Sequence, residues 1–300
     1  MISEKAYRDD FKLSEHDVYL YVQAKGSNAL SLVTAFETSR NKEYLKAAVE
    51  KFPSEPLVQA KALMWLDMSD EDRARMIEDF KKSAATNAYP NMLAAKEAMK
   101  RGDTTGALAE LAAAKEKDYE EYFRESMQGA EEAYLSAGRL EAEAKILGIS
   151  DITLPHLVQL KMLGQQFLEL AEKAGAAGDT KTQQEMLQVN WEIGQKLRSA
   201  PESVPMISEL VGIAMQNATL TKWPADVNFG DRLAPDIRNS NLAARKDMQA
   251  GAPVFDKWFP NAPDEEIINY VERIKTSGEQ RAMAWLREQH PEFGPIQAQK

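Results

Sequence analysis

The sequence predicts an all-α protein, and two observations carry this prediction. Ala, Glu, Lys, Leu and Gln, which are good helix formers, dominate long stretches of the 300 residues. The alternation of apolar and polar residues that marks a half-buried strand is hard to find anywhere along the chain. An apolar fraction of 44% is ample for a buried core in a chain of this length. We therefore expect helices packed against helices.

Composition also limits the functions open to the chain. Acidic residues outnumber basic ones by 47 to 37, which gives a net charge of −10 and argues against affinity for phosphate backbones. Cysteine is absent, so disulfides, thiolate metal sites and a cysteine nucleophile are excluded. We expect no nucleic-acid partner and no cofactor.

The sequence says more about the solubility of the chain than about its cellular compartment. No apolar run approaches the roughly 18 residues needed to cross a bilayer, and the start from Met1 to Arg8 has no apolar core of a signal peptide. We expect a soluble chain with no membrane insertion. It is either cytoplasmic or the soluble part of an exported or anchored bacterial-type protein whose signal lies outside this sequence. The oligomeric state is left open.

The clearest internal repetition is a helical hairpin that turns at Gly102-Asp103. Glycine can adopt the left-handed conformation that ends a helix, and aspartate can cap the helix that follows. The small residues Ala95, Ala107 and Ala114 let the two helices approach closely. A second copy turns at Gly178-Asp179. Superposing the two turns pairs Ala171 with Ala95, Ala174 with Ala98 and Leu187 with Leu111.

A third, weaker copy ends at Phe52-Pro53, where proline cannot continue the helix, and has Arg40-Asn41 at its turn. Together these segments resemble tetratricopeptide repeats, whose unit of ~34 residues has small residues at set places in both helices and often a proline after the second. Glu50–Pro56 is similar to the usual ending of that family, and Ala133–Ala142 to its turn. The resemblance covers roughly the first two thirds of the chain and implies an α-solenoid of stacked antiparallel hairpins.

Other helices can be placed by their ends. Ser14 and Ser69 each stand three residues before an aspartate, as in a capping box, and Pro155 opens a further long helix. A helical pair between residues 119 and 147 breaks near Gly138. These helices complete a predicted repeat domain over residues 1–199.

Residues 200–300 are predicted to form a proline-rich segment that packs on the repeats or caps them. The stretch 221–263 reads as mostly loop with one helix around 240–249, because prolines follow one another closely there. A terminal helical hairpin follows, with one helix over 264–275 and a last one after Gly278.

Catalytic motifs are missing from the sequence, so we expect the protein not to be an enzyme. His16, His156 and His290 stand far apart, and none has a partner at the spacing of a metal site. Carboxylate pairs such as Glu131-Glu132 are best interpreted as solvated helix faces, since neighbours on a helix point about 100° apart.

The leading functional hypothesis is a non-catalytic scaffold for protein–protein interaction. A peptide or partner protein would lie along a concave surface and contact the first helix of each hairpin. The candidate contacts are Asn91, Lys96, Lys100, Gln166, Glu169 and Lys173. Because the chain is acidic, a partner with basic character is expected.

The alternative hypothesis is a small-ligand binding protein or an enzyme whose pocket is closed by the C-terminal segment. Its candidate aromatic pocket consists of Trp223, Phe229, Trp258 and Phe259. An aromatic residue beside proline can also pin a loop to the helices, and this interpretation is favoured for Trp223 and Trp258. A third possibility is that the C-terminal segment itself fills the concave surface.

Overall fold

The computed structural model describes residues 12–199, 205–223, 228–229 and 231–293. Within them nearly all regular structure is α-helical, and the strands are limited to a two-stranded antiparallel ladder of β1 (Asn228–Phe229) and β2 (Arg232–Leu233). The all-α prediction is confirmed. Some predictions concern the chain start, Pro201 and Pro224, and these lie outside the described residues.

Helix packing divides the chain into two units. Unit 1 takes residues 1–85, 121–153 and 250–300, and unit 2 takes residues 86–120 and 154–249. Each unit is therefore built from segments that are far apart in the sequence. The boundary between residues 199 and 200 that composition suggests falls within unit 2, beside residues that the structure does not describe, and it stays a prediction.

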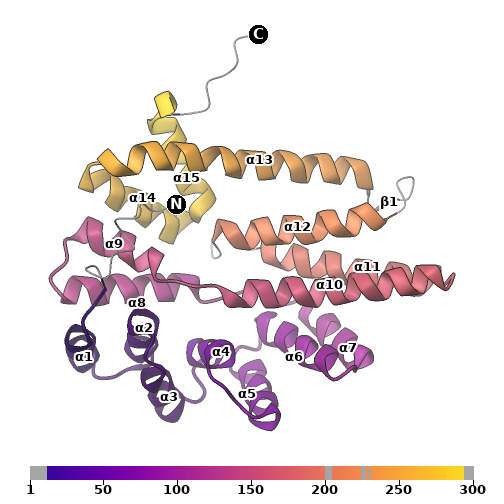
Figure 1. Cartoon of the computed structure of the whole chain (residues 1–300), viewed down its shortest axis with the longest axis horizontal. Helices are drawn as coiled ribbons and strands as arrows, with labels where there is room; N and C mark the ends of the chain where they lie inside the picture. The colour runs from indigo at the N-terminus through magenta and orange to yellow at the C-terminus, as the bar shows by residue number, and fades with distance from the viewer. Residues whose placement is uncertain (1–11, 200–204, 224–227, 230, 294–300) are drawn as a thin grey trace. The chain divides into compact units, whose positions relative to one another are not determined.

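Unit 1 is a stack of helical hairpins (Figure 1). Helix α2 packs on α3, α4 and α8, helix α8 packs on α9, and α9 packs on α14, which pairs with α15. Its helices are α1 (Glu15–Ala24), α2 (Ala29–Ser39), α3 (Lys42–Lys51), α4 (Pro56–Trp65), α5 (Asp70–Ser83), α8 (Phe123–Ser136), α9 (Glu141–Ser150), α14 (Asp264–Ser277) and α15 (Glu279–Gln289).

Unit 2 contains two hairpins and a further helix. Helix α6 packs on α7, helix α11 packs on both α10 and α12, and the first helices of the two hairpins, α6 and α10, touch each other. Its helices are α6 (Tyr89–Lys100), α7 (Thr104–Ala114), α10 (Pro155–Ala176), α11 (Thr180–Arg198) and α12 (Met206–Lys222). Helix α13 (Ala234–Trp258) begins in unit 2 and ends in unit 1.

The predicted hairpin turns share one backbone geometry. Gly102 and Gly178 both have φ of 76°, Gly138 has φ of 79°, and Arg40 takes the same left-handed conformation at 61°. The carboxylates of Asp103 and Asp179 accept a hydrogen bond from the backbone N–H three residues on, at 2.8 and 3.0 Å. Repetition seen in the sequence is thus present in the fold.

Small side chains face the hairpin interiors as expected. Ala95, Ala107, Ala114 and Ala171 are buried, and Ala174 is half-buried. The prediction of paired, packed helices in these segments is therefore confirmed, because α6 packs on α7, α10 packs on α11, and most of the recurring alanines are buried.

The expectation for residues 221–263 is wrong over most of that stretch. One 25-residue helix, α13, replaces the expected loop and short helix, and it contains Pro253 in its interior. The helix forms because its inward face buries apolar residues at helical spacing, namely Ile237, Met248, Val254 and Trp258. Burial of that face outweighs the one backbone hydrogen bond that an internal proline removes.

Helices α11 and α12 approach most closely at a pair of glycines. A methyl group added to Gly194 would lie 2.8 Å from the carbonyl oxygen of Gly212, and one added to Gly212 would lie 2.5 Å from that of Gly194. Both distances are below ordinary contact, and the opposing atoms are backbone. The glycines therefore set how tightly these helices pack in unit 2.

Replacing Gly212 by alanine should destabilise unit 2, by about 1–3 kcal/mol from overpacking. The matched control is Gly175→Ala in α10, where the new methyl group meets only the flexible side chain of Gln183. That control should be neutral or stabilise by up to about 1 kcal/mol through helix propensity. Urea unfolding followed by circular dichroism measures both. Equal midpoints would contradict the close-packing argument.

A buried ion pair joins three helices of unit 1. The Lys61 ammonium on α4 lies 2.6 Å from a Glu37 carboxylate oxygen on α2, and the two side chains are 1% and 4% exposed. The hydroxyl of Ser126 on α8 donates to the same carboxylate at 3.1 Å. Since an unpaired buried charge costs several kcal/mol, this contact constrains which faces of α2, α4 and α8 can meet.

Lys61→Met should leave the Glu37 carboxylate buried without its countercharge and destabilise the fold by about 3–5 kcal/mol. Lys42→Met removes a lysine from an exposed pair with Asp67 and should cost less than about 1 kcal/mol. The double variant Glu37→Leu/Lys61→Met should recover most of the loss, because no charge then remains buried. Thermal unfolding compares the variants, and similar losses for Lys61→Met and Lys42→Met would exclude the proposed cause.

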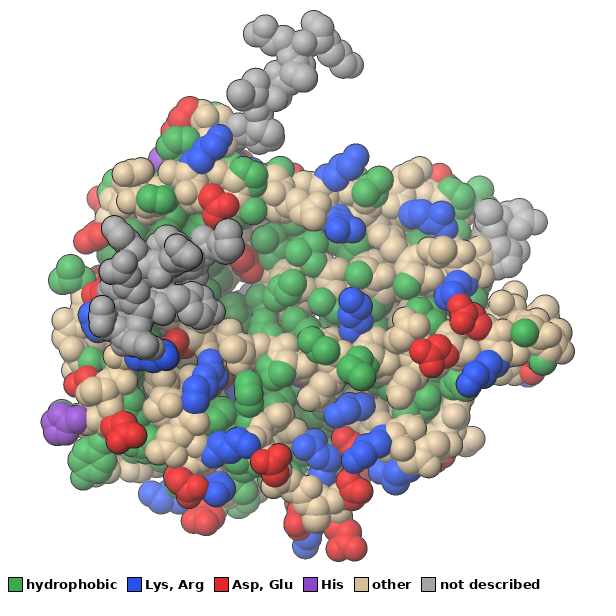
Figure 2. Space-filling model, viewed as in Figure 1, with side chains coloured by type: hydrophobic (Ala, Val, Ile, Leu, Met, Phe, Trp, Pro, Cys, Tyr) green, Lys and Arg blue, Asp and Glu red, His purple; other side chains and the backbone are tan. Residues whose placement is uncertain are grey.

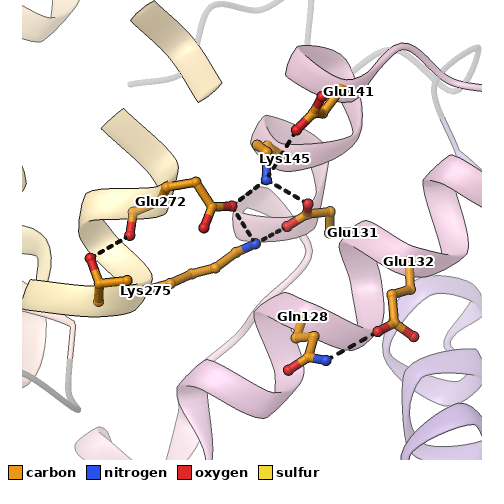
Figure 3. A network of polar contacts seen from close by, with 8 residues as sticks. Gln128, Glu131, Glu132, Glu141, Lys145, Glu272 and Lys275 are labelled. Carbon is orange, nitrogen blue, oxygen red and sulfur yellow. Dashed lines mark hydrogen bonds and ion pairs between the residues drawn. The ribbon is translucent and has the colours of Figure 1, made fainter. Parts of the chain in front are cut away.

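A second charge network fastens the C-terminal hairpin of unit 1 (Figure 3). Lys145 on α9 lies 2.6 Å from Glu131 on α8 and also contacts Glu272 on α14, while Lys275 on α14 contacts Glu131. Burial lowers the pKa of Lys145, but hydrogen bonds to Glu131 and Glu272 outweigh it and raise that pKa above its ordinary value. The interpretation of Glu131 as part of a solvated face is wrong, because it is buried between two lysines.

Candidate functional site

One hollow of unit 2 lies between the second helices of its two hairpins. Because α6 and α10 touch, α7 and α11 flank a cleft of about 220 Å³. Met92, Leu111, Val189 and Ile193 give it an apolar floor. Its remaining lining residues, mostly polar, are Ala114, Lys115, Glu116, Glu192, Gln195, Lys196 and Ser199.

Charged side chains bridge the cleft at its rim. The ammonium of Lys115, the residue that follows α7, lies 3.4 Å from a carboxylate oxygen of Glu192 on α11, and both side chains keep substantial exposure. Lys196 donates to the backbone carbonyl of Lys117, just beyond α7. Gln188 donates to Glu192 at 2.9 Å. An exposed ion pair contributes at most about 1 kcal/mol, so a ligand could displace this bridge at low cost.

A second, more open hollow of about 480 Å³ adjoins the first and shares Val189 with it. Leu108 of α7 and Trp223, which follows α12, supply most of its apolar surface. The indole Nε1 of Trp223 is buried and has no hydrogen-bond partner among the residues that the structure describes. We call the two hollows together the α7–α11 groove, lined by residues 92, 108, 111, 114–116, 184, 185, 188, 189, 192, 193, 195, 196, 199 and 223.

The first set of sequence-predicted contacts, on α6, lies outside this groove. Asn91 is buried, donating to Glu110 at 2.7 Å and accepting from Lys117 at 2.8 Å, so it ties α6 to the end of α7. Lys96 is half-buried and donates to Gln159 on α10 at 3.0 Å, whereas Lys100 is exposed. Asn91 therefore has a structural contact where a partner contact was expected.

The second set, on α10, is exposed. Gln166, Glu169 and Lys173 continue a face of α10 that begins with two apolar side chains, Val158 and Met162, which are 62% and 63% exposed. Spacings of three and four residues keep all five on one side of the helix. This face, which we call the α10 face, is a second surface that a partner could contact.

The four aromatic residues of the predicted pocket fall into two groups. Trp223 and Phe229 meet in unit 2, with ring centres 4.5 Å apart, and Phe229 also packs on Trp191. Trp258 and Phe259 belong to unit 1 and pack around Phe255. Phe229 and Trp258 are buried, and Trp223 and Phe259 are half-buried beside them, which favours the pinning interpretation of these aromatics.

Unit 1 has a groove of similar construction. The first helices α2 and α4 pack together, and an open groove of about 640 Å³ lies between the second helices α3 and α5. An exposed pair, Lys42 and Asp67, crosses it at 3.0 Å. Its lining carries both signs of charge over an apolar floor: Lys42, Lys46, Val49, Pro53, Gln59, Leu66, Asp67, Met68, Ser69, Asp72, Arg75, Met76 and Asp79.

Charge on the visible surface is mixed. On the face shown in Figure 2, Lys and Arg side chains are interspersed with Asp and Glu, with hydrophobic side chains between them. Across the described residues, no three His, Cys, Asp or Glu side chains gather as a metal site would require. None of the helices in the described ranges has the length and apolarity that a membrane crossing needs.

The residues of the α7–α11 groove were not predicted from the sequence, although one signal was present. Met186, Ile193 and Leu197 are buried on the inward face of α11, and Val189, at the edge of that face, is half-buried. A half-buried apolar residue at the edge of the core face is consistent with a further contact surface on the same helix.

Comparison with known proteins adds no relative. No family model, no curated protein and no solved structure matches this chain. The function is therefore inferred from the residues of the grooves.

Proposed function

We propose that the chain is a non-catalytic scaffold of tetratricopeptide-like hairpins that binds a peptide or partner protein in the α7–α11 groove. The observation that carries the proposal is a cleft lined by apolar residues of α6, α7 and α11, beside the contact of α6 with α10. Turn geometry shared by α6–α7, α8–α9 and α10–α11 supports the repeat-like part of the proposal.

The size of the cleft favours a peptide side chain over a cofactor. Sites for drug-sized ligands occupy roughly 300–1,000 Å³, and the enclosed cleft has about 220 Å³. That volume suits one or two apolar side chains inserted from a partner. Gln184, Gln188 and Gln195 on α11 lie along the groove and can bond a peptide backbone.

The charges at the rim support a binding role as well. Lys115 and Glu192 pair with each other across the opening, so neither is directed as a free acid or base at the cleft floor. From the net charge of −10, a partner with basic character is expected, and its binding should weaken as salt rises.

A small-ligand binding role is the second candidate, favoured by one observation. The buried Nε1 of Trp223 lacks an acceptor beside the more open hollow, and a small polar ligand could supply one. The residues that line the enclosed cleft all come from α6, α7, α11 and the ends of these helices. A small ligand bound in that cleft would therefore not need the C-terminal segment to close over it.

Selection of a random peptide library on the immobilised full chain tests the leading proposal. Enriched peptides should share an apolar anchor residue, and Val189→Glu should weaken their binding at least about tenfold, because it places a charge in the apolar floor. Met162→Glu, on the α10 face, is the matched control and should leave the affinity unchanged. Fluorescence anisotropy with a synthesised peptide gives both affinities.

The opposite effects of these two variants would place the binding site elsewhere. If Met162→Glu abolished binding and Val189→Glu did not, the partner would lie on the α10 face, as the sequence-based hypothesis has it. Failure to enrich any peptide, together with thermal stabilisation of the chain by small molecules that Val189→Glu removes, would favour the second candidate.

A further inference from the structure

The last helix of unit 1 ends at a histidine held between two carboxylates. His290 follows α15, and its Nε2 lies 3.0 Å from an oxygen of Glu266, in the first turn of α14. Its Nδ1 lies 3.1 Å from an oxygen of Glu292, in the turn that follows. A carboxylate only accepts, and an imidazole donates from both nitrogens only when it is protonated. The geometry therefore suits the imidazolium.

Four elements of unit 1 meet at this point. The indole N–H of Trp258, at the end of α13, donates to the same Glu266 oxygen at 2.8 Å. The ring of Phe293 stacks on the imidazole, with centres 5.5 Å apart and planes 17° apart. The side chain of His290 is 17% exposed, so water is partly excluded from its hydrogen bond with Glu266, while the bond with Glu292 is exposed. Loss of either bond would loosen the turn that carries Phe293.

The charges around His290 favour its protonated form. Glu266 faces it from α14 and Glu292 from the following turn, while on α13 Lys257 reaches the carbonyl of Phe293 at 3.4 Å. Arg287 precedes it on α15. Burial lowers the pKa of His290, but hydrogen bonds to Glu292 and Glu266 outweigh burial and raise that pKa above 6.5. The hydrogen bond from Trp258 and the contact with His290 hold the pKa of Glu266 below its usual value.

We propose that His290 is a pH-sensitive latch that fastens the end of α15, with the turn at residues 291–293, to the first turn of α14. When the imidazole loses its proton, one ring nitrogen becomes an acceptor facing a carboxylate, and that hydrogen bond is lost. The contact of Phe293 and the end of α15 then open locally.

The sign of the pH dependence follows from the two groups. Because the pKa of His290 is raised, its stabilisation is fully present below pH 6.5 and is lost as the pH rises through the raised value. Because the pKa of Glu266 is lowered, its contribution persists until the pH falls below 4.5. The latch is thus closed in weakly acidic solution and opens as the pH rises through the raised pKa of His290.

The opening is confined to the end of α15 and the turn at residues 291–293. Helix α14 is held independently on α8 and α9 by Lys145, which contacts Glu272, and by Lys275, which contacts Glu131 (Figure 3). The pKa of Lys145 is raised above its ordinary value, so this lysine stays charged as the pH crosses neutrality. Amide groups inside α14 should therefore keep their protection while those at residues 290 and 293 lose it. This contrast separates a latch from general destabilisation.

Two measurements on the full chain test the proposal. The ring Cε1–H signals of the three histidines, followed by NMR, should give His290 a pKa above 6.5, and Glu266→Gln should lower it. Hydrogen exchange, corrected for the intrinsic rate, reports the His290 amide, which donates to Leu286, and the Phe293 amide, which donates to His290. Their protection should fall about threefold to tenfold between about pH 6 and pH 8.5, matching the net contribution of one partly exposed hydrogen bond.

Matched variants separate the latch from other causes. His290→Gln should abolish the pH step in protection, and His16→Gln, on exposed α1, should leave it intact. An unchanged titration of His290 in Glu266→Gln would overturn the proposal. So would pH-independent protection at residues 290 and 293 in the unaltered chain, or an equal loss across α14.

Discussion

Buried pairing of opposite charges is the constraint on which unit 1 depends. Apolar burial is not directional, so by itself it leaves several ways to match helices taken from three distant parts of the chain. Glu37 with Lys61 fixes α2 against α4, and Glu131 with Lys145 and Lys275 fixes α8 and α9 against α14. A wrong register would strand a charge without a partner, which costs more than most single apolar contacts gain.

Unit 2 reaches its packing by other means, and its candidate site follows from that. Glycines at the α11–α12 crossing bring two backbones together, and the contact of α6 with α10 places the neighbouring hairpins. The second helices α7 and α11 are left with apolar side chains between them and polar ones at the edge. The groove is therefore a product of how the hairpins stack, and it needs no segment devoted to forming it.

Local features were predictable from the sequence, and long-range ones were not. Glycine followed by aspartate specifies a turn through its own backbone preferences, so the hairpins at residues 102 and 178 could be read directly. Helix α13 was missed because Pro253 carries a strong local signal, whereas burial of Val254 depends on the rest of the fold. The candidate groove was missed for the same reason: Val189 becomes part of a site only once α7 lies opposite α11.

The turn between α2 and α3 ties local conformation to distant assembly. Arg40 occupies a backbone region that side chains with a Cβ normally avoid, at a cost of order 1 kcal/mol. Its guanidinium reaches the backbone carbonyl of Asp151 at 2.6 Å, across 111 residues of sequence, and lies over the ring of Trp65. The contact with Asp151 can form only after α9 has docked, so the turn between α2 and α3 is completed by a residue from a distant part of the chain.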